Sequence, residues 1–148
     1  FQEIREKRGL VYSISSYTSS FSDSGVFGVY AGTGQKEVME LVPVLCDQLN
    51  IDASTFTLEE LQRAKAQFKS ALLMGQESTS TRCRSNASKY LMHNRLIPIE
   101  EIISEIDSVK LDDLERARKN ILKSNITLSS IGPVKNLESL DSIKRRFS

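Results

Sequence analysis

Two alternating apolar runs that flank a Ser-rich turn constrain the fold of this chain most strongly. In the first run, Leu10, Tyr12 and Ile14 share one predicted face, as a half-buried strand requires. The tract SSFSDSG, residues 19–25, has the composition of a turn, and the run VFGVYAGT, residues 26–33, then alternates again. Two such runs joined by a polar turn predict an antiparallel β-hairpin. Gly28 leaves one position of the second strand bare, so we expect a neighbour to pack closely there.

After the hairpin the apolar residues recur at helical spacing. Pro43 lies inside the first of these segments, and because an interior proline costs a helix about 3 kcal/mol, we expect a kink or a late start there. Thr57 and Glu60 have the spacing of a capping box. The segments predicted to be helical are residues 34–50, 55–78, 80–95, 98–109, 111–125 and 137–147.

The apolar stripes predict which helix faces are buried. On segment 55–78 the stripe consists of Leu58, Leu61, Ala64, Phe68 and Leu72, and on segment 98–109 of Ile102, Ile103 and Ile106. Residues 126–132, ITLSSIG, are predicted to form a third strand. The predicted class is therefore α+β, an antiparallel sheet with helices packed on one face.

The 148 residues are the length of one domain, so we expect residues 1–148 to form a single domain. Phe1 and Ile4 fit one face of a short helix that Gly9 ends. Three strands are few for this much helix, and the chain opens inside that helix. We therefore expect it to be the larger part of a domain whose upstream strands belong to a longer protein, and we expect an uncovered surface that recruits the rest of that protein or forms a dimer.

The charge balance argues against a nucleic-acid partner. With 20 basic and 19 acidic side chains the net charge is +1, whereas nucleic-acid binders usually carry a clear basic excess. The sequence contains no apolar run near the roughly 20 residues of a membrane helix, so we expect a soluble protein without a membrane span.

Few side chains are candidates for a metal centre. Cys46, Cys83 and His93 lie in separate predicted helices, and none of their pairs has zinc-ligand spacing. We therefore expect no zinc site in this chain, two reduced thiols, and a histidine at a surface or helix end. The AGTG stretch, residues 31–34, joins a strand to a helix, where phosphates bind in other proteins. It lacks the full phosphate-loop pattern and is interpreted as a plain turn.

Arg5 and Tyr12 are the remaining candidates for chemistry. Arginine is a permanent cation with forked donors, and a tyrosine hydroxyl donates to a carbonyl or an oxyanion. Both residues also have structural interpretations. Arg5 suits a helix C-terminus because of the helix dipole, and a tyrosine on a strand is usually part of the core.

At these residues the sequence resembles a known family. FQEIREKRGLVYSISSY followed by GVFGVYAGT is similar to the C-terminal domain of the insulinase, pitrilysin and mitochondrial processing peptidase superfamily. The helix TLEELQRAKAQFKSALLMGQES with Glu77, Ser78 and Arg82, and the segment ITLSSIGPV, extend the resemblance over nearly the whole chain. The subgroup it resembles most is the bacterial and mitochondrial processing-peptidase type.

The resemblance implies a function in peptide cleavage. In that family two homologous α+β domains close on each other, the N-terminal one carrying zinc on an H-x-x-E-H motif with a distal Glu ligand. The C-terminal domain contributes an Arg and a Tyr seven residues apart, which contact the substrate backbone and stabilise the transition state. Arg5 and Tyr12 have that spacing. The resemblance places the protein in a bacterial cytoplasm or periplasm or in the mitochondrial matrix.

This chain contains no H-x-x-E-H, so zinc is expected only in an absent N-terminal domain. The first hypothesis is the substrate-binding part of a zinc metallopeptidase that cleaves peptides or presequences and is inactive alone. Its partners would be an N-terminal zinc domain or a homologous subunit, and a peptide. The alternative is a non-catalytic structural or docking subunit of the same superfamily, like the core proteins of respiratory complexes. A third is an unrelated α+β binding module.

Overall fold

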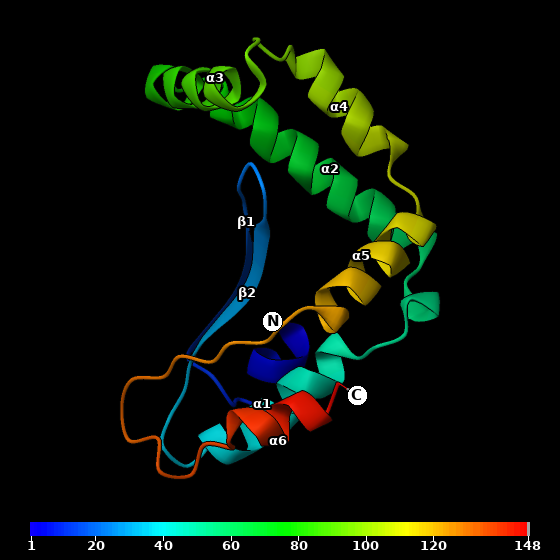
Figure 1. The fold of residues 1–148 in the computed structure, drawn as a ribbon. Coiled ribbons are helices and arrows are strands. Elements are labelled where there is room, and N and C mark those ends of the chain that lie inside the picture. The colour runs from blue at the N-terminus through cyan, green and yellow to red at the C-terminus, as the bar shows by residue number, and fades with distance from the viewer. Residues whose placement is uncertain (148) are drawn as a thin grey trace. The chain divides into compact units, whose positions relative to one another are not determined.

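A computed structural model describes residues 1–147 of the chain (Figure 1). Its elements confirm the α+β class, with one antiparallel two-stranded sheet among helices. In chain order they are the π-helical turn η1 (Gln2–Glu6), β1 (Ser13–Ser20), β2 (Gly25–Gly32), α1 (Val38–Leu49), the 3₁₀ turn η2 (Ala53–Thr55), α2 (Leu58–Gly75), α3 (Thr79–His93), α4 (Ile99–Ser108), α5 (Leu111–Lys123) and α6 (Leu140–Arg145).

The chain divides into two compact units. The first unit contains Phe1–Ile51 and the chain from Arg118 onward, and the second contains Asp52–Ala117. The hairpin, η1, α1 and α6 belong to the first unit, while α2, α3 and α4 belong to the second. Each unit has its own packing.

The hairpin has the predicted strands and turn. β1 pairs with β2 from Ser13 opposite Gly32 to Ser20 opposite Gly25, which leaves residues 21–24 as the loop. The Phe21 N–H donates to the Ser24 carbonyl across that loop, with the two atoms 2.9 Å apart. Figure 1 shows the two strands side by side along their length. A loop of four residues is one of the common hairpin connections.

The prediction for Gly28 is confirmed. Tyr17 is its partner across the hairpin, and the tyrosine ring lies over the glycine. A Cβ on Gly28 would lie 2.5 Å from the Tyr17 hydroxyl oxygen and 2.7 Å from its Cε1. The bare position on β2 therefore accommodates a cross-strand aromatic ring.

Alternation of burial holds only in part along β2, where Gly28 is half-buried together with Phe27 and Val29, and it fails just before β1. On β2, Val26 and Tyr30 are exposed while the residues between them are half-buried. The prediction that residues 10, 12 and 14 share one face is wrong, because Leu10 and Val11 are both buried and Tyr12 is exposed. β1 begins only at Ser13, so residues 10–12 are not bound by the period of two that a strand imposes.

The predicted third strand does not form. Residues 126–132 have no regular secondary structure, and Ile131 is fully exposed. The sheet of the described residues consists of β1 and β2 alone. An alternating sequence favours a strand, but a strand forms only where neighbouring backbone donors and acceptors are available to pair with it.

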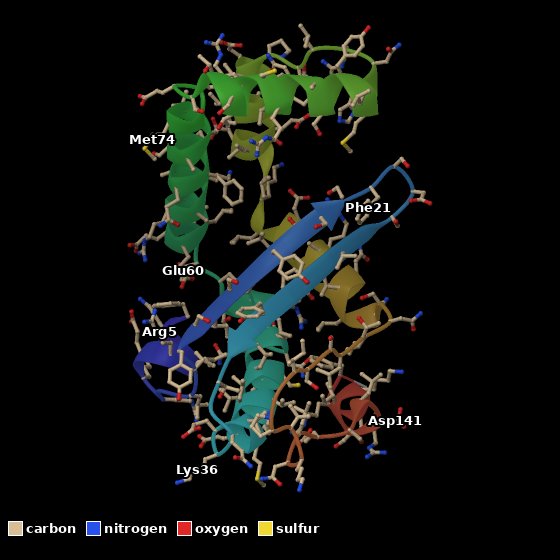
Figure 2. All side chains as sticks on the ribbon, turned by 90° about the vertical axis from the view of Figure 1, so that its left-hand side faces the viewer. Arg5, Phe21, Lys36, Glu60, Met74 and Asp141 are labelled. Carbon is tan, nitrogen blue, oxygen red and sulfur yellow. The ribbon has the colours of Figure 1, made fainter. Side chains whose placement is uncertain are left out.

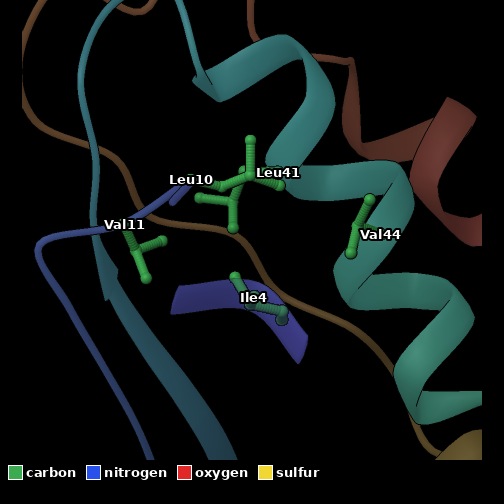
Figure 3. Packing of buried hydrophobic residues seen from close by; sticks show 5 residues of the cluster. All are labelled: Ile4, Leu10, Val11, Leu41 and Val44. Atoms are coloured by element: carbon green, nitrogen blue, oxygen red, sulfur yellow. The ribbon is translucent and has the colours of Figure 1, made fainter. Parts of the chain in front are cut away.

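A small hydrophobic core holds the first unit together. It contains Ile4 from η1, Leu10 and Val11 from the approach to β1, and Leu41 and Val44 from α1 (Figure 3). Three separate segments therefore meet at one cluster. The turn and the base of the hairpin are anchored to α1 by apolar burial, the dominant favourable term in such packing.

Helix α1 forms despite its proline. It begins at Val38, later than the predicted segment, and this start brings Pro43 into its second turn. Pro43 has no N–H for the carbonyl four residues earlier, at Met39, whose side chain is exposed. α6 packs against the other end of α1, where Asn50 Nδ2 donates to the Arg146 carbonyl at 2.8 Å.

The capping box that starts α2 is confirmed. The Glu60 N–H donates to Thr57 Oγ1 at 3.1 Å, and the Thr57 N–H donates to Glu60 Oε2 at 2.9 Å. The Thr57 hydroxyl also donates to the same carboxylate oxygen. These bonds stabilise the charged carboxylate, and they lower the pKa of Glu60.

The buried face of α2 differs from the predicted stripe. Leu61 is buried as expected, but Phe68 is 70% exposed and Lys65 is buried instead. Lys65 Nζ donates to the Asp107 carbonyl at 2.8 Å, and Lys69 Nζ pairs with the Asp107 carboxylate at 2.7 Å. The side of α2 that meets the end of α4 thus carries two lysines, because a cation suits a helix C-terminus.

α3 has no buried residue, and α4 is more exposed than predicted. α3 begins at the Ser78 cap, whose hydroxyl oxygen accepts from the Thr81 N–H at 3.3 Å, and none of its residues is buried. On α4, the three isoleucines at positions 102, 103 and 106 are half-buried rather than buried. Within its unit α4 packs against α2, so only part of its apolar stripe is covered.

Candidate functional site

Arg5 lies on the η1 turn, directly after a buried anchor. The preceding residue, Ile4, is part of the core of the first unit, whereas the Arg5 side chain is exposed. Its guanidinium lies over the Phe1 ring, 4.9 Å from the ring centre, in cation–π geometry. Figure 2 shows Arg5 on this turn near the base of the hairpin. The guanidinium donors are thus left available to an incoming acceptor.

Gly9 reverses the chain between the turn and the hairpin. Its φ of +63° is left-handed, a conformation that glycine adopts without steric cost. The Gly9 N–H donates to the Arg5 carbonyl at 3.0 Å, and the Leu10 N–H donates to the Ile4 carbonyl at 3.1 Å. The predicted end of the helix at Gly9 is therefore confirmed, and it fixes where the chain enters the hairpin.

Tyr12 also follows a buried residue and points outward. Val11 belongs to the core, while 77% of Tyr12 is exposed, so the interpretation of Tyr12 as core is wrong. Its N–H donates to the Gly32 carbonyl at 2.7 Å, which extends the hairpin pairing by one residue. Nearby, Thr33 Oγ1 donates to the Leu10 carbonyl at 2.6 Å. The backbone of Tyr12 is fixed, and its ring is presented to solvent.

Arg5 and Tyr12 are therefore anchored to one core but do not contact each other. Ile4 and Val11, the residues before them, pack in the same cluster with α1 (Figure 3). Among the described residues no hydrogen bond or ring contact joins the two side chains. The arrangement can present a forked cation and a hydroxyl donor from one rigid base to a ligand with oxygen acceptors.

The AGTG stretch is a turn only in its second half: Ala31 and Gly32 end β2, while Thr33 and Gly34 begin the connection to α1. This connection also contains Glu37, a residue that the sequence did not single out. A Cβ on Gly34 would lie 3.5 Å from the Tyr12 hydroxyl oxygen and 3.2 Å from the carboxylate carbon of Glu37. Gly34 and Glu37 are thus neighbours of Tyr12. The signal that could have located Gly34 is the hairpin register, which has Ser13 opposite Gly32. Continued by one residue, this register brings Tyr12 opposite residue 33, next to Gly34.

The other polar candidates lie apart from this region. Cys46 is buried on α1, and Cys83 is exposed on α3; both are free thiols, as predicted. Burial raises the pKa of the Cys46 thiol. His93 is exposed in the last turn of α3, a helix end as predicted. Among residues 1–147 no three His, Cys, Asp or Glu side chains lie close enough to hold a metal ion. The residues present therefore do not fit a zinc centre.

These features define an α+β domain that presents an exposed arginine and tyrosine from one anchored base. A family model described as the peptidase M16 inactive domain matches residues 1–68. A protein named as an uncharacterized zinc protease from Rickettsia felis is 38% identical over 133 residues, which cover 90% of this chain and 32% of that protein. A probable mitochondrial-processing peptidase subunit beta from Arabidopsis thaliana is 30% identical over 135 residues, covering 90% of this chain and 25% of that one.

The solved structures agree on the fold. A chain of complex III2 from Candida albicans matches 98% of this chain and 35% of its own length, with a TM-score of 0.80 and 24% identity. The chain belongs to the insulinase, pitrilysin and mitochondrial processing peptidase superfamily and matches its C-terminal domain. It spans about a third of the length of the curated zinc proteases that it matches. No helix among the described residues is long and apolar enough to cross a bilayer.

Proposed function

We propose that this chain is the peptide-contacting C-terminal part of a zinc metallopeptidase that cleaves peptides or presequences. The zinc proteases among its relatives support the proposal, since the chain aligns with about a third of each. In this proposal residues 1–148 are the larger part of one C-terminal domain. Further strands and an N-terminal zinc domain, or a homologous subunit, belong to the longer parent protein. The zinc ligands lie in that partner domain, and the chain alone is inactive.

The observation that carries the proposal is the exposure of both Arg5 and Tyr12 from one core. A peptide carbonyl that gains negative charge during hydrolysis is stabilised by hydrogen-bond donors held in place beforehand. The Tyr12 hydroxyl supplies one donor, and the Arg5 guanidinium supplies several in a fixed fork. Because their neighbours Ile4 and Val11 are buried together, both donors start from fixed backbone positions. In this role the two residues bind and orient the peptide and stabilise the developing charge.

The test is Tyr12→Phe and Arg5→Ala in the full-length parent, with turnover and melting temperature measured on the same samples. We expect each variant to lower kcat by about 10²–10³, in line with the loss of an oxyanion donor. The melting temperature should stay unchanged because both side chains are exposed. Tyr30→Phe and Arg8→Ala are matched controls, an exposed tyrosine on β2 and a second arginine after η1. Full turnover in Tyr12→Phe and Arg5→Ala would refute the proposal.

The second candidate is a non-catalytic structural or docking subunit, and one observation favours it. The fold is shared by a chain of complex III2 from Candida albicans. The upstream sequence of the parent separates the two candidates, because only a peptidase needs an H-x-x-E-H motif there. Zinc analysis of the full-length parent then checks the result. We expect one zinc per parent and none in residues 1–148 alone.

A further inference from the structure

The carboxylate of Glu37 and the Tyr12 hydroxyl both lie next to Gly34. The point where a Cβ on Gly34 would lie is 3.2 Å from Glu37 Cδ and 3.5 Å from the Tyr12 hydroxyl oxygen, and a Glu37 carboxylate oxygen is closer still. A hydroxyl donor and a carboxylate acceptor therefore flank the same bare piece of backbone. These residues come from three segments: the approach to β1, the turn after β2 and the start of α1.

The Glu37 carboxylate lies at the start of α1 without a hydrogen-bond partner among the described residues. Glu37 precedes α1 at the cap position, but its side chain makes no capping hydrogen bond. No hydrogen bond or ion pair to this carboxylate occurs in residues 1–147, although the residue is half-buried. By contrast Glu40, three residues later, pairs with Arg8 at 3.8 Å. No buried side-chain oxygen among the described residues lacks a partner, so the Glu37 oxygens reach solvent and are free to accept a hydrogen bond from a ligand beside the candidate site.

Position 34 needs a glycine because of the limited space around it, and not because of its backbone conformation. Among the described glycines only Gly9 and Gly132 have a positive φ, so the backbone at Gly34 is open to any residue. A side chain there would meet the end of the Glu37 side chain and then the Tyr12 hydroxyl. The glycine therefore keeps the gap between donor and acceptor open.

We propose that Glu37 is a second peptide-contacting residue beside Tyr12, and that Gly34 is a positioning residue for both. In an extended peptide the N–H and the C=O of one residue point to the same side, as in the residue pairs of an antiparallel ladder. The Tyr12 hydroxyl donates to that carbonyl, and the Glu37 carboxylate accepts from that N–H. A bare glycine between them lets the peptide backbone approach closely. This inference rests on the proposed function and identifies the ligand chemistry as extended peptide backbone.

The test is a double-mutant cycle between Glu37 and the peptide backbone in the full-length parent. One arm is Glu37→Ala, with Glu40→Ala from the first turn of α1 as the control. The other arm is a set of substrate peptides in which single amides are replaced in turn by esters, which removes one N–H at a time. We expect Glu37→Ala to lower kcat/KM about tenfold, as for a lost hydrogen bond to a charged group. At one position the ester should lower kcat/KM of the wild type by a similar factor. The same ester should not lower kcat/KM of Glu37→Ala any further.

Gly34→Ala gives an independent reading. The added methyl group displaces the Glu37 carboxylate, which lies at the end of a flexible side chain, so kcat/KM should fall without loss of melting temperature. If Tyr12→Phe is impaired but Glu37→Ala and Gly34→Ala are not, the inference is overturned while the proposed function stands. Additive effects of Glu37→Ala and every ester position would overturn it as well. If Tyr12→Phe is also unimpaired, both are overturned.

Discussion

The Tyr17 ring lies across Gly28, its register partner on β2, so close that a Cβ on the glycine would sit 2.5 Å from the tyrosine hydroxyl oxygen. A hairpin of two strands is marginal by itself, and cross-strand side-chain contacts are the unit of its stabilisation. Here the ring covers backbone that would otherwise be exposed on that face. The contact joins the middle of β1 to the middle of β2 and is not part of the core cluster around Ile4.

We predict that Gly28→Ala destabilises the chain. The new methyl group displaces the Tyr17 ring, and losing a cross-strand aromatic contact costs about 0.2–1 kcal/mol. Urea unfolding followed by circular dichroism measures the free energy of unfolding. Gly25→Ala is the matched control on the same strand, because its Cβ would meet only the Ser19 carbonyl oxygen at an ordinary 3.5 Å. Equal stability of both variants would show that the ring contact contributes nothing.

The capping box predicts a pH dependence for α2. Hydrogen bonds from the Thr57 N–H and hydroxyl lower the pKa of Glu60 from its ordinary value of 4.5. Because the folded pKa is the lower one, the stabilisation is complete above pH 4.5 and is lost as the pH falls through the folded pKa. Between pH 7 and pH 3 the melting temperature should therefore fall less in Glu60→Gln than in the wild type. Glu59→Gln, which replaces the neighbouring acid in the first turn, should show the same fall in melting temperature as the wild type.

We predict that Lys65 and Lys69, two lysines on the same face of α2, contribute differently to the free energy of unfolding. The Lys65 ammonium is buried and donates to the Asp107 carbonyl, while Lys69 pairs with the Asp107 carboxylate at the surface. Lys65→Met leaves a carbonyl at the end of α4 without its donor and should cost about 1–3 kcal/mol. Lys69→Met should cost about 0.2–1 kcal/mol, the range of an exposed ion pair. Urea unfolding of both variants is the measurement, and a larger loss in Lys69→Met would contradict the structure.

The two thiols should react at very different rates. Cys83 is exposed, whereas Cys46 is 3% exposed and burial raises its pKa, so less thiolate is present at any given pH. With a disulfide reagent at pH 8 we expect one fast thiol per chain and a second only after denaturation. Cys83→Ser should remove the fast phase and Cys46→Ser the slow one. Two fast thiols in the native chain would show that α1 is not packed as described.

Local signals in the sequence predicted several elements correctly because their causes are local. The capping box of Thr57 and Glu60 involves residues three apart, and the turn at residues 21–24 follows from its own composition. The reversal of the chain at Gly9, after η1, also follows from the conformational freedom of a single residue. The contact of the Tyr17 ring with Gly28 follows once the hairpin register is known. In each case the interacting groups are fixed by short stretches of chain.

What the sequence by itself determined is the α+β class, the hairpin, the helical segments and the choice of Arg5 and Tyr12 as candidates. Only the tertiary structure decided which faces are buried. It placed Lys65 inside and Phe68 outside on α2, left residues 126–132 without a strand, and turned Tyr12 to solvent beside Gly34 and Glu37. The physical reason is that burial and strand pairing depend on what a residue meets from distant parts of the chain. Periodicity records a preference for a face, but a partner from elsewhere is needed to cover it.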